Sequence, residues 1–331
     1  MGRRKRHHTV TRMLLEGFAE RNQVVARTRG GRDYTQAITN ATVVADFYSF
    51  DNEGRPDDAM EDWLAENVES AFHQLLPALR AGDQPTSTHR PSIARFVAVA
   101  ALRTRTVRSY MEQIDQQTAG SAVLLKIAPE LGWDLASMSQ RTVRHLRALC
   151  QQAWNALPPR PDDAASRLRV VVRESHRLES ALLRYVWSVA TTEQPSFLIG
   201  DAPVTALSGR EQGWGGVVPR GATVFLPLSP HALLLGEPHV FGHHFSADAL
   251  VPTVNQLTAR EAFDAVYRHP KMAWPTPTGL GSQPPQLPTP SFRVSRPEPG
   301  TPPTFPYVYP TIDEEATHKL LDHLGAVDIV E

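Results

Sequence analysis

Cysteine is almost missing from this sequence, since Cys150 is the only one in 331 residues. A single cysteine excludes an internal disulfide and a zinc site built from several thiolates, and it is typical of a reducing compartment. We therefore expect a cytoplasmic protein stabilised by a hydrophobic core. The length is sufficient for one large domain or two smaller ones.

Long hydrophobic runs are also absent. The apolar-rich stretches 96–102 and 232–235 are far shorter than the roughly 20 residues that a membrane-spanning helix needs. The basic run at 3–6 precedes an apolar segment that Glu16 interrupts, so it lacks the continuous hydrophobic region of an export signal. The sequence therefore predicts neither a membrane span nor export.

An excess of charge of either sign is missing too. Lys and Arg number 34 and Asp and Glu 35, so the molecule as a whole has no field that would attract nucleic acid. The basic residues 3–6 are a local exception, but a terminal run of this kind is typical of a flexible, solvated tail. The sequence also contains no Gly-x-Ser-x-Gly, phosphate-binding loop or His-Glu-x-x-His motif that would fix a reaction.

Apolar periodicity predicts a mainly helical body. Segments rich in β-branched and aromatic residues predict strands at 7–10 and 41–50 and between 197 and 235, with a turn at 27–33. We expect an α+β fold in which the N-terminal strands and the strands of the C-terminal half form one small, mostly antiparallel sheet. The predicted helices are 12–22, 57–80, 93–108, 121–127, 135–149, 164–191 and 254–268.

Proline is concentrated near the C-terminus. Nearly half of the 28 prolines lie between Pro270 and Pro310, where aliphatic residues are few. Such a segment lacks the apolar surface that would offset the entropy of ordering it. We therefore predict a basic flexible tail at 1–6, a single α+β domain at 7–270, a disordered Pro-rich linker at 271–310 and a short helix at 311–331.

Two adjacent histidines, His7 and His8, follow the basic run. Histidine titrates near neutrality, so such a pair can transfer protons, bind a metal or contact phosphate. Neighbours in an extended segment point to opposite faces, so only one of the two would reach a shared site. The alternative is a buried histidine whose ring is satisfied by hydrogen bonds.

Asp201, Arg103 and Asn255 are the other polar candidates. Asp201 lies in a Gly-Asp-Ala-Pro turn after an apolar strand, where it is either a functional carboxylate or a turn residue bonded to the backbone. Arg103 lies on a helix rich in Ala and Val; if buried it needs a carboxylate, for which Asp201 is a candidate, and otherwise it flanks the helix in solvent. Asn255 stands where we expect a helix to begin, as a helix cap or a positioning group.

Three separated blocks of residues also carry a resemblance. They are Arg6-His7-His8-Thr9-Val10-Thr11 with Leu15 and Phe18, then Arg103-Thr104, then Ile199-Gly200-Asp201-Ala202-Pro203-Val204 with Pro227-Leu228-Ser229-Pro230, and Asn255 fits the same order. In these blocks the chain resembles a bacterial family known as domain of unknown function 4238 (DUF4238), over residues 5–270. Thr9, Thr11, Gly200 and Ala202 depart from the Tyr, Pro, Ser and Asn of that family. The resemblance implies positions and no activity.

We expect His7 or His8, Arg103, Asp201 and Asn255 to converge in one polar pocket. The hypothesis is a phosphate-directed hydrolase, most specifically a nuclease, whose partner is nucleic acid or another phosphate-containing ligand. Histidine would be the general base or a metal ligand, Asp201 a metal ligand or orienting group, Arg103 the anion clamp and Asn255 a positioning group. A divalent metal would be held by His8 and Asp201.

The competing hypothesis is a non-catalytic binding or scaffold module. In it the same polar residues form a buried network that fixes the N-terminal strand against the sheet. An open pocket with His and Asp side chains within reach of each other favours an enzyme, whereas full burial with backbone partners favours the scaffold. The sequence gives no indication of the oligomeric state.

Overall fold

A computed structural model describes residues 6–45, 47, 50–52, 55–57, 59–156, 164–207, 218, 221–238, 246–275 and 280–281. The predicted tail, apart from Arg6, the predicted C-terminal helix and most of the predicted Pro-rich linker lie outside these residues. The chain divides into two compact units, one made of residues 1–109 and 163–287 and the other of residues 110–162 and 288–331. The prediction of a single domain at 7–270 stays a prediction, which an unfolding experiment can test.

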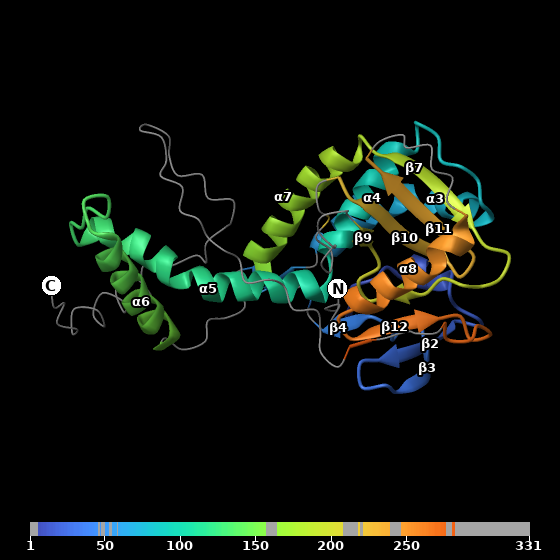
Figure 1. Cartoon of the computed structure of the whole chain (residues 1–331), viewed down its shortest axis with the longest axis horizontal. Helices are drawn as coiled ribbons and strands as arrows, with labels where there is room; N and C mark the ends of the chain where they lie inside the picture. The colour runs from blue at the N-terminus through green and yellow to red at the C-terminus, as the bar shows by residue number, and fades with distance from the viewer. Residues whose placement is uncertain are drawn as a thin grey trace. The chain divides into compact units, whose positions relative to one another are not determined.

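The first unit contains all the described strands and most of the described helices (Figure 1). Its strands are β1 (Arg6–His8), β2 (Gln23–Thr28), β3 (Asp33–Ala37), β4 (Val43–Ala45), β5 (Phe50–Asn52), β6 (Arg55–Asp57), β7 (Val186–Thr191), β8 (Ile199–Gly200), β9 (Thr205–Leu207), β10 (Thr223–Ser229), β11 (Ala232–Glu237) and β12 (Ala265–Arg268). Its helices are α1 (Arg12–Glu16), α2 (Ala59–Leu64), the π-helix η1 (Ala65–Glu69), α3 (Ser70–Ala81), α4 (Arg90–Leu102), α7 (Ala164–Leu182) and α8 (Ala247–Glu261).

The second unit is helical in its described part. The helix α5 (Arg105–Glu130) begins in the first unit and continues in the second, which also contains α6 (Gln140–Ala156). A small core joins the two helices, with Ile127 of α5 and Leu146 and Cys150 of α6 all buried. None of the helices in the described ranges is both long and apolar enough to span a membrane.

The α+β class is confirmed, and every described strand pair is antiparallel. The strands do not form one sheet, as we predicted, but several. Two sheets have four strands each, in the orders β7–β11–β10–β9 and β3–β2–β12–β8, while β1 pairs with β4 and β5 with β6. The second four-stranded sheet combines N-terminal strands with late ones, whereas the first is built from late strands alone.

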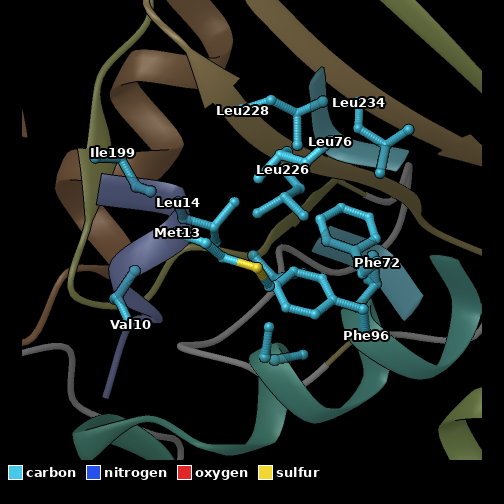
Figure 2. Packing of buried hydrophobic residues seen from close by; sticks show 14 of the residues in the cluster. Val10, Met13, Leu14, Phe72, Leu76, Phe96, Ile199, Leu226, Leu228 and Leu234 are labelled. Carbon is cyan, nitrogen blue, oxygen red and sulfur yellow. The ribbon is translucent and has the colours of Figure 1, made fainter. Parts of the chain in front are cut away.

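The sheet β7–β11–β10–β9 is covered on both faces, which explains why β10 and β11 are almost continuously apolar. On one face Leu226 and Leu234 pack in the main core with Phe72 of α3 and Phe96 of α4 (Figure 2). The rings of Phe72 and Phe96 stack with centroids 3.9 Å apart. The other face carries Phe225, Leu233 and Leu235, which pack against α8.

The helix α8 lies between the two four-stranded sheets (Figure 1). Val254 and Leu257 pack on β10 and β11. Ala259, and Ala262 just after the helix, pack on Val266 of β12. The helix therefore connects the sheet β7–β11–β10–β9 to the sheet that carries the site described below.

Several predicted elements have different boundaries. The predicted helix at 93–108 is interrupted at Arg103 and Thr104, and α5 continues through the predicted helix at 121–127 to Glu130. The predicted helix at 164–191 ends at Leu182 and is followed by β7, and the predicted helix at 254–268 is α8 followed by β12. The strand expected at 41–50 is represented by the short β4 and by β5, and β3 was not predicted.

Candidate functional site

A polar cleft lies over one face of the sheet β3–β2–β12–β8. The register places Tyr34 of β3 and Tyr267 of β12 on either side of Ala26 of β2, and directly opposed residues of an antiparallel sheet share a face. Thr28 and Gln36 lie two residues from Ala26 and Tyr34 and so share that face. The cleft has a volume of about 390 Å³, and both tyrosines, Thr28 and Gln36 line it.

The N-terminal segment forms another wall of the cleft through Thr9 and Thr42. Thr42 has φ +57°, a left-handed conformation that is rare for a β-branched residue and costs free energy. The backbone N–H and the hydroxyl of Thr9 donate to the Thr42 carbonyl at 3.0 and 3.1 Å, and the Thr42 hydroxyl donates to the Val10 carbonyl at 3.2 Å. These hydrogen bonds hold the strained residue and fix the N-terminal segment at the cleft.

Asp201 supplies a buried carboxylate to the cleft, with 4% of the residue exposed. Its Oδ1 accepts from the Phe263 N–H at 2.6 Å, and its Oδ2 accepts from the N–H groups of Asp264 at 2.7 Å and Ala265 at 3.3 Å. Burial raises the pKa of Asp201 to about 6, although the backbone N–H groups and the charges of Arg105 and Arg29 lower it. The carboxyl therefore titrates close to neutrality, which is typical of functional sites and also of some structural networks.

Two arginines bring positive charge to the cleft. Arg29 donates from Nε to the Phe263 carbonyl at 2.6 Å, from Nη1 to the Gly281 carbonyl at 2.9 Å and from Nη2 to the Ala262 carbonyl. It therefore binds the backbone after α8, where a cation also interacts favourably with the helix dipole.

Arg105 has a different environment. Its Nη1 forms an ion pair with Asp264, and its guanidinium lies 4.6 Å from the centre of the Phe263 ring. The two side chains of this ion pair are 37% and 49% exposed. An exposed ion pair of this kind contributes little stability, so another anion can compete for the arginine.

The predicted site residues His7, His8 and Arg103 lie around β1. His7 is fully buried, and the Nδ1 of His8 lies 3.1 Å from the Ala41 carbonyl. Arg103 is 5% exposed and donates to Glu69 at 2.8 Å and to the His8 carbonyl at 3.4 Å. The buried arginine thus has a carboxylate partner, as expected, but it is Glu69 and not Asp201.

Asn255 lies in the interior of α8, so the prediction that it begins a helix is wrong. Its Oδ1 accepts from the Leu198 N–H at 2.9 Å, and its Nδ2 donates to the Ser196 carbonyl at 2.8 Å. Asn255 and the segment after α8 therefore hold the chain at both ends of the stretch from Ser196 to Asp201. Both partners are backbone groups, and the role of Asn255 as a positioning group for a substrate stays a prediction.

The predicted residues thus form two groups. Arg103 meets His8 at the backbone of β1, and Asn255 holds the segment that leads to Asp201. Of the predicted residues, Asp201 lines the cleft, and the N-terminal segment reaches the cleft through Thr9, directly after His8. Within the described ranges no three His, Cys, Asp or Glu side chains gather as they would around a metal ion. The catalytic and metal-binding roles of these residues stay predictions.

Sequence reasoning missed the cleft residues Arg29, Tyr34 and Tyr267. Tyr34 and Thr35 are of residue types that are enriched in strands, and they were the available signal for β3. Tyr267 was assigned to the predicted helix at 254–268, so its pairing with residues of neighbouring strands was not predicted. Arg29 lies in a turn, where its sequence context gave no indication that it reaches α8.

A comparison with known protein families found a match. Residues 6–272 match the family described as "Protein of unknown function (DUF4238)", which confirms the resemblance seen in the sequence. No curated protein and no solved structure matches the chain. Because the match covers more than half of the sequence, the chain belongs to the DUF4238 family.

Proposed function

We propose that this protein binds a phosphate-containing ligand in the cleft over the sheet β3–β2–β12–β8. The observation that carries the proposal is Arg105, a partly exposed guanidinium in a polar cleft whose carboxylate partner, Asp264, is itself half exposed. A phosphate can replace that carboxylate because a guanidinium binds both groups through paired N–H donors. Arg29 adds a second positive charge nearby.

The remaining groups suit a polar ligand. Thr9, Gln36 and Asn40 line the same cleft and supply hydroxyl and amide groups that donate and accept hydrogen bonds. Asn255 and Arg103 form hydrogen bonds within the protein, which supports a binding module more than an enzyme that uses these side chains. Binding is therefore the function that the geometry supports best, and the single cysteine supports a cytoplasmic location for it.

Isothermal titration with pyrophosphate tests this proposal. We expect Arg105→Gln to weaken pyrophosphate binding about tenfold or more, because a hydrogen bond to a charged group contributes about 1.5–3 kcal/mol. Arg27→Gln is a matched control: Arg27 also pairs with an aspartate, Asp33, at 2.7 Å and lies 4.2 Å from an aromatic ring, that of Trp274. Arg27 is directly opposite Asp33 on one side and Val266 on the other, so its side chain lies on the face of the sheet opposite to Tyr34 and Tyr267.

The control distinguishes pyrophosphate binding at a specific site from general electrostatic attraction between the anion and any arginine. Arg27→Gln should leave pyrophosphate affinity unchanged. Equal losses in the two variants would contradict a specific role for Arg105. Failure of the unaltered protein to bind pyrophosphate would contradict the proposed function itself.

A phosphate-directed hydrolase, with a nuclease as its most specific form, is the second candidate. The observation that favours it is the carboxyl of Asp201, which lines the cleft and has a pKa of about 6, suitable for general acid–base catalysis. Labelled RNA and DNA should be incubated with the protein and divalent metals. We expect cleavage, and a loss of about a hundredfold in Asp201→Asn, since general acid–base catalysis contributes about 10²–10⁴-fold.

His8→Ala tests the predicted role of the histidine in the same assay, and Asp248→Ala, at an exposed position of α8, is the control. The fold of each variant is checked by circular dichroism. Equal background cleavage by the unaltered protein and by all variants would remove the hydrolase proposal and leave the binding proposal in place.

A further inference from the structure

Tyr34 has an unusual position among the aromatic residues. Among the Phe, Trp and Tyr residues whose exposure the structure describes, it is the only one with an exposed side chain, at 44%. A single exposed aromatic residue is common on protein surfaces and needs no explanation by itself. The surroundings of Tyr34 are what point to a ligand.

Tyr34 lines two clefts at once. One is the polar cleft of about 390 Å³ with Arg105, and the other has a volume of about 680 Å³ and is lined by Arg32 and Asp33. Thr28 and Gly30 also line both clefts. The ring of Tyr34 therefore lies where the two spaces meet, and a ligand in the first cleft can extend against it.

The position of Tyr34 on an edge strand leaves one side of the ring without a neighbouring strand. Tyr34 is directly opposite Ala26, whose small side chain separates it from Tyr267 on the same face of the sheet. Because β3 is an edge strand, with β2 as its partner, the far side of Tyr34 has no neighbouring strand in the sheet. A planar group can therefore lie against the phenol ring without displacing a core residue.

Gln36 completes the pattern. It lies two residues after Tyr34 on β3, faces the same cleft and carries an amide that both donates and accepts. Such an amide can hydrogen bond to the polar edge of a nucleobase. An exposed aromatic ring for stacking beside a cation for phosphate is a recurrent way to bind nucleotides.

We propose that the ligand of the cleft is a nucleoside phosphate whose base stacks on Tyr34 while its phosphate contacts Arg105. This inference rests on the proposed function, because it assigns the phosphate to the same arginine. The nucleoside phosphate is either a free nucleotide or the terminal unit of a single strand, since both present the same base and phosphate.

The test compares the affinities of ribose 5-phosphate and adenosine 5′-monophosphate by isothermal titration. The protein should bind adenosine 5′-monophosphate more tightly by a factor of about five or more, because stacking of a base on an aromatic side chain is worth that factor. Tyr34→Ala should remove this difference. Tyr34→Phe should preserve the difference, since it retains the ring.

Thr35→Ala is the matched control on the same strand. Thr35 is exposed and is paired with Val25, on the face opposite to the cleft, so its loss should change neither affinity. A triadenylate as third ligand distinguishes the two sources. Tighter binding than that of the mononucleotide supports a strand terminus, and equal binding supports a free nucleotide.

The two levels of the proposal fail in different ways. If ribose 5-phosphate binds through Arg105 and adenosine 5′-monophosphate binds no more tightly, the nucleotide inference is overturned and the phosphate site remains. The same holds if Tyr34→Ala leaves the ratio of the two affinities unchanged. If neither compound binds, both the inference and the proposed function are wrong.

Discussion

Asp201 combines burial with a full set of backbone partners. Its two oxygens accept three N–H groups from the segment after α8, an arrangement that favours the ionised form. Burial acts in the opposite direction and is the larger effect, so the pKa is raised from 3.8 to about 6. The residue therefore lowers the stability of the folded protein when it is ionised, which makes its contribution measurable.

The stability of the fold should depend on pH through this carboxyl. Between about pH 4 and pH 6 the folded state retains a proton that the unfolded state has released, so the free energy of unfolding falls as the pH rises. Above pH 6 the loss is complete and amounts to about 3 kcal/mol, from about 1.4 kcal/mol for each pKa unit. Asp201→Asn removes the titration. Urea unfolding from pH 4 to 7 should show the difference in stability between the two proteins changing across this window.

The direction of the change is the decisive observation. The unaltered protein should lose stability relative to Asp201→Asn as the pH rises. The asparagine has one acceptor oxygen in place of two and should cost stability at every pH, but this cost is a constant offset. Parallel stability curves for the two proteins would show that the folded-state pKa of Asp201 is not raised.

From the sequence, the polar residues that are buried could be identified more readily than their partners. It indicated Asp201, Arg103 and Asn255, all of which are buried and hydrogen bonded. A buried arginine needs a carboxylate, which was predicted, but Glu69 lies 34 residues away on another helix and no local pattern pointed to it. Contacts of this kind depend on tertiary structure.

At the scale of elements, helix boundaries predicted from apolar periodicity were wrong where tertiary contacts bind the backbone N–H groups that a longer helix would need. The predicted helix at 254–268 ends after Glu261 because the N–H groups of Phe263, Asp264 and Ala265 bond to Asp201 and not to helix carbonyls. The interruption at Arg103 has a local cause, since the Thr104 hydroxyl accepts from the Val107 N–H at 3.2 Å and caps the start of α5. Thr is a preferred N-cap residue, so Thr104 in the sequence was a signal that a helix begins there.

Strand β7 shows a second kind of ambiguity. Leu182, Val186 and Val189 recur at intervals that fit a helix, and the same segment alternates with Trp187 and Val189 buried, as in a strand. Pairing with β11 decides the outcome, because Trp187 lies opposite Gly236 and its ring would be 2.6 Å from a Cβ at that position. Only glycine leaves room for the ring. The strands β10 and β11 were predictable because a sheet covered on both faces is apolar throughout.

For the whole molecule, the division into two compact units raises the question of cooperativity. The described core of the second unit comprises a few residues of α5 and α6, including Ile127 and Leu146, whereas the main core of the first unit draws on both four-stranded sheets and several helices. Stability increases with the apolar area that a unit buries. The second unit should therefore open at lower denaturant concentrations than the first.

The reactivity of Cys150 can be used to measure the unfolding of the second unit. It is the only cysteine of the chain, it lies in the core of the second unit with 1% exposed, and burial raises the pKa of its thiol to about 11. The thiolate is the reactive form, so the folded unit should react slowly with an alkylating reagent. Pulse alkylation of Cys150 and deuterium exchange of the amides of β10 and β11 are both measured by mass spectrometry in a series of urea concentrations. Cys150 should become alkylated at a lower urea concentration than that at which these amides exchange.

The fully unfolded protein gives the intrinsic alkylation rate of Cys150 and serves as the reference for the series. Alkylation that precedes exchange in β10 and β11 would show that the two units open separately, because Cys150 and these strands belong to different cores. Coincident transitions would instead mean that the units unfold as one, as the predicted single domain at 7–270 requires. The length of α5 makes the result informative: a helix that begins in one unit and continues in the other must fray within its own hydrogen-bonded turns if only the second unit opens.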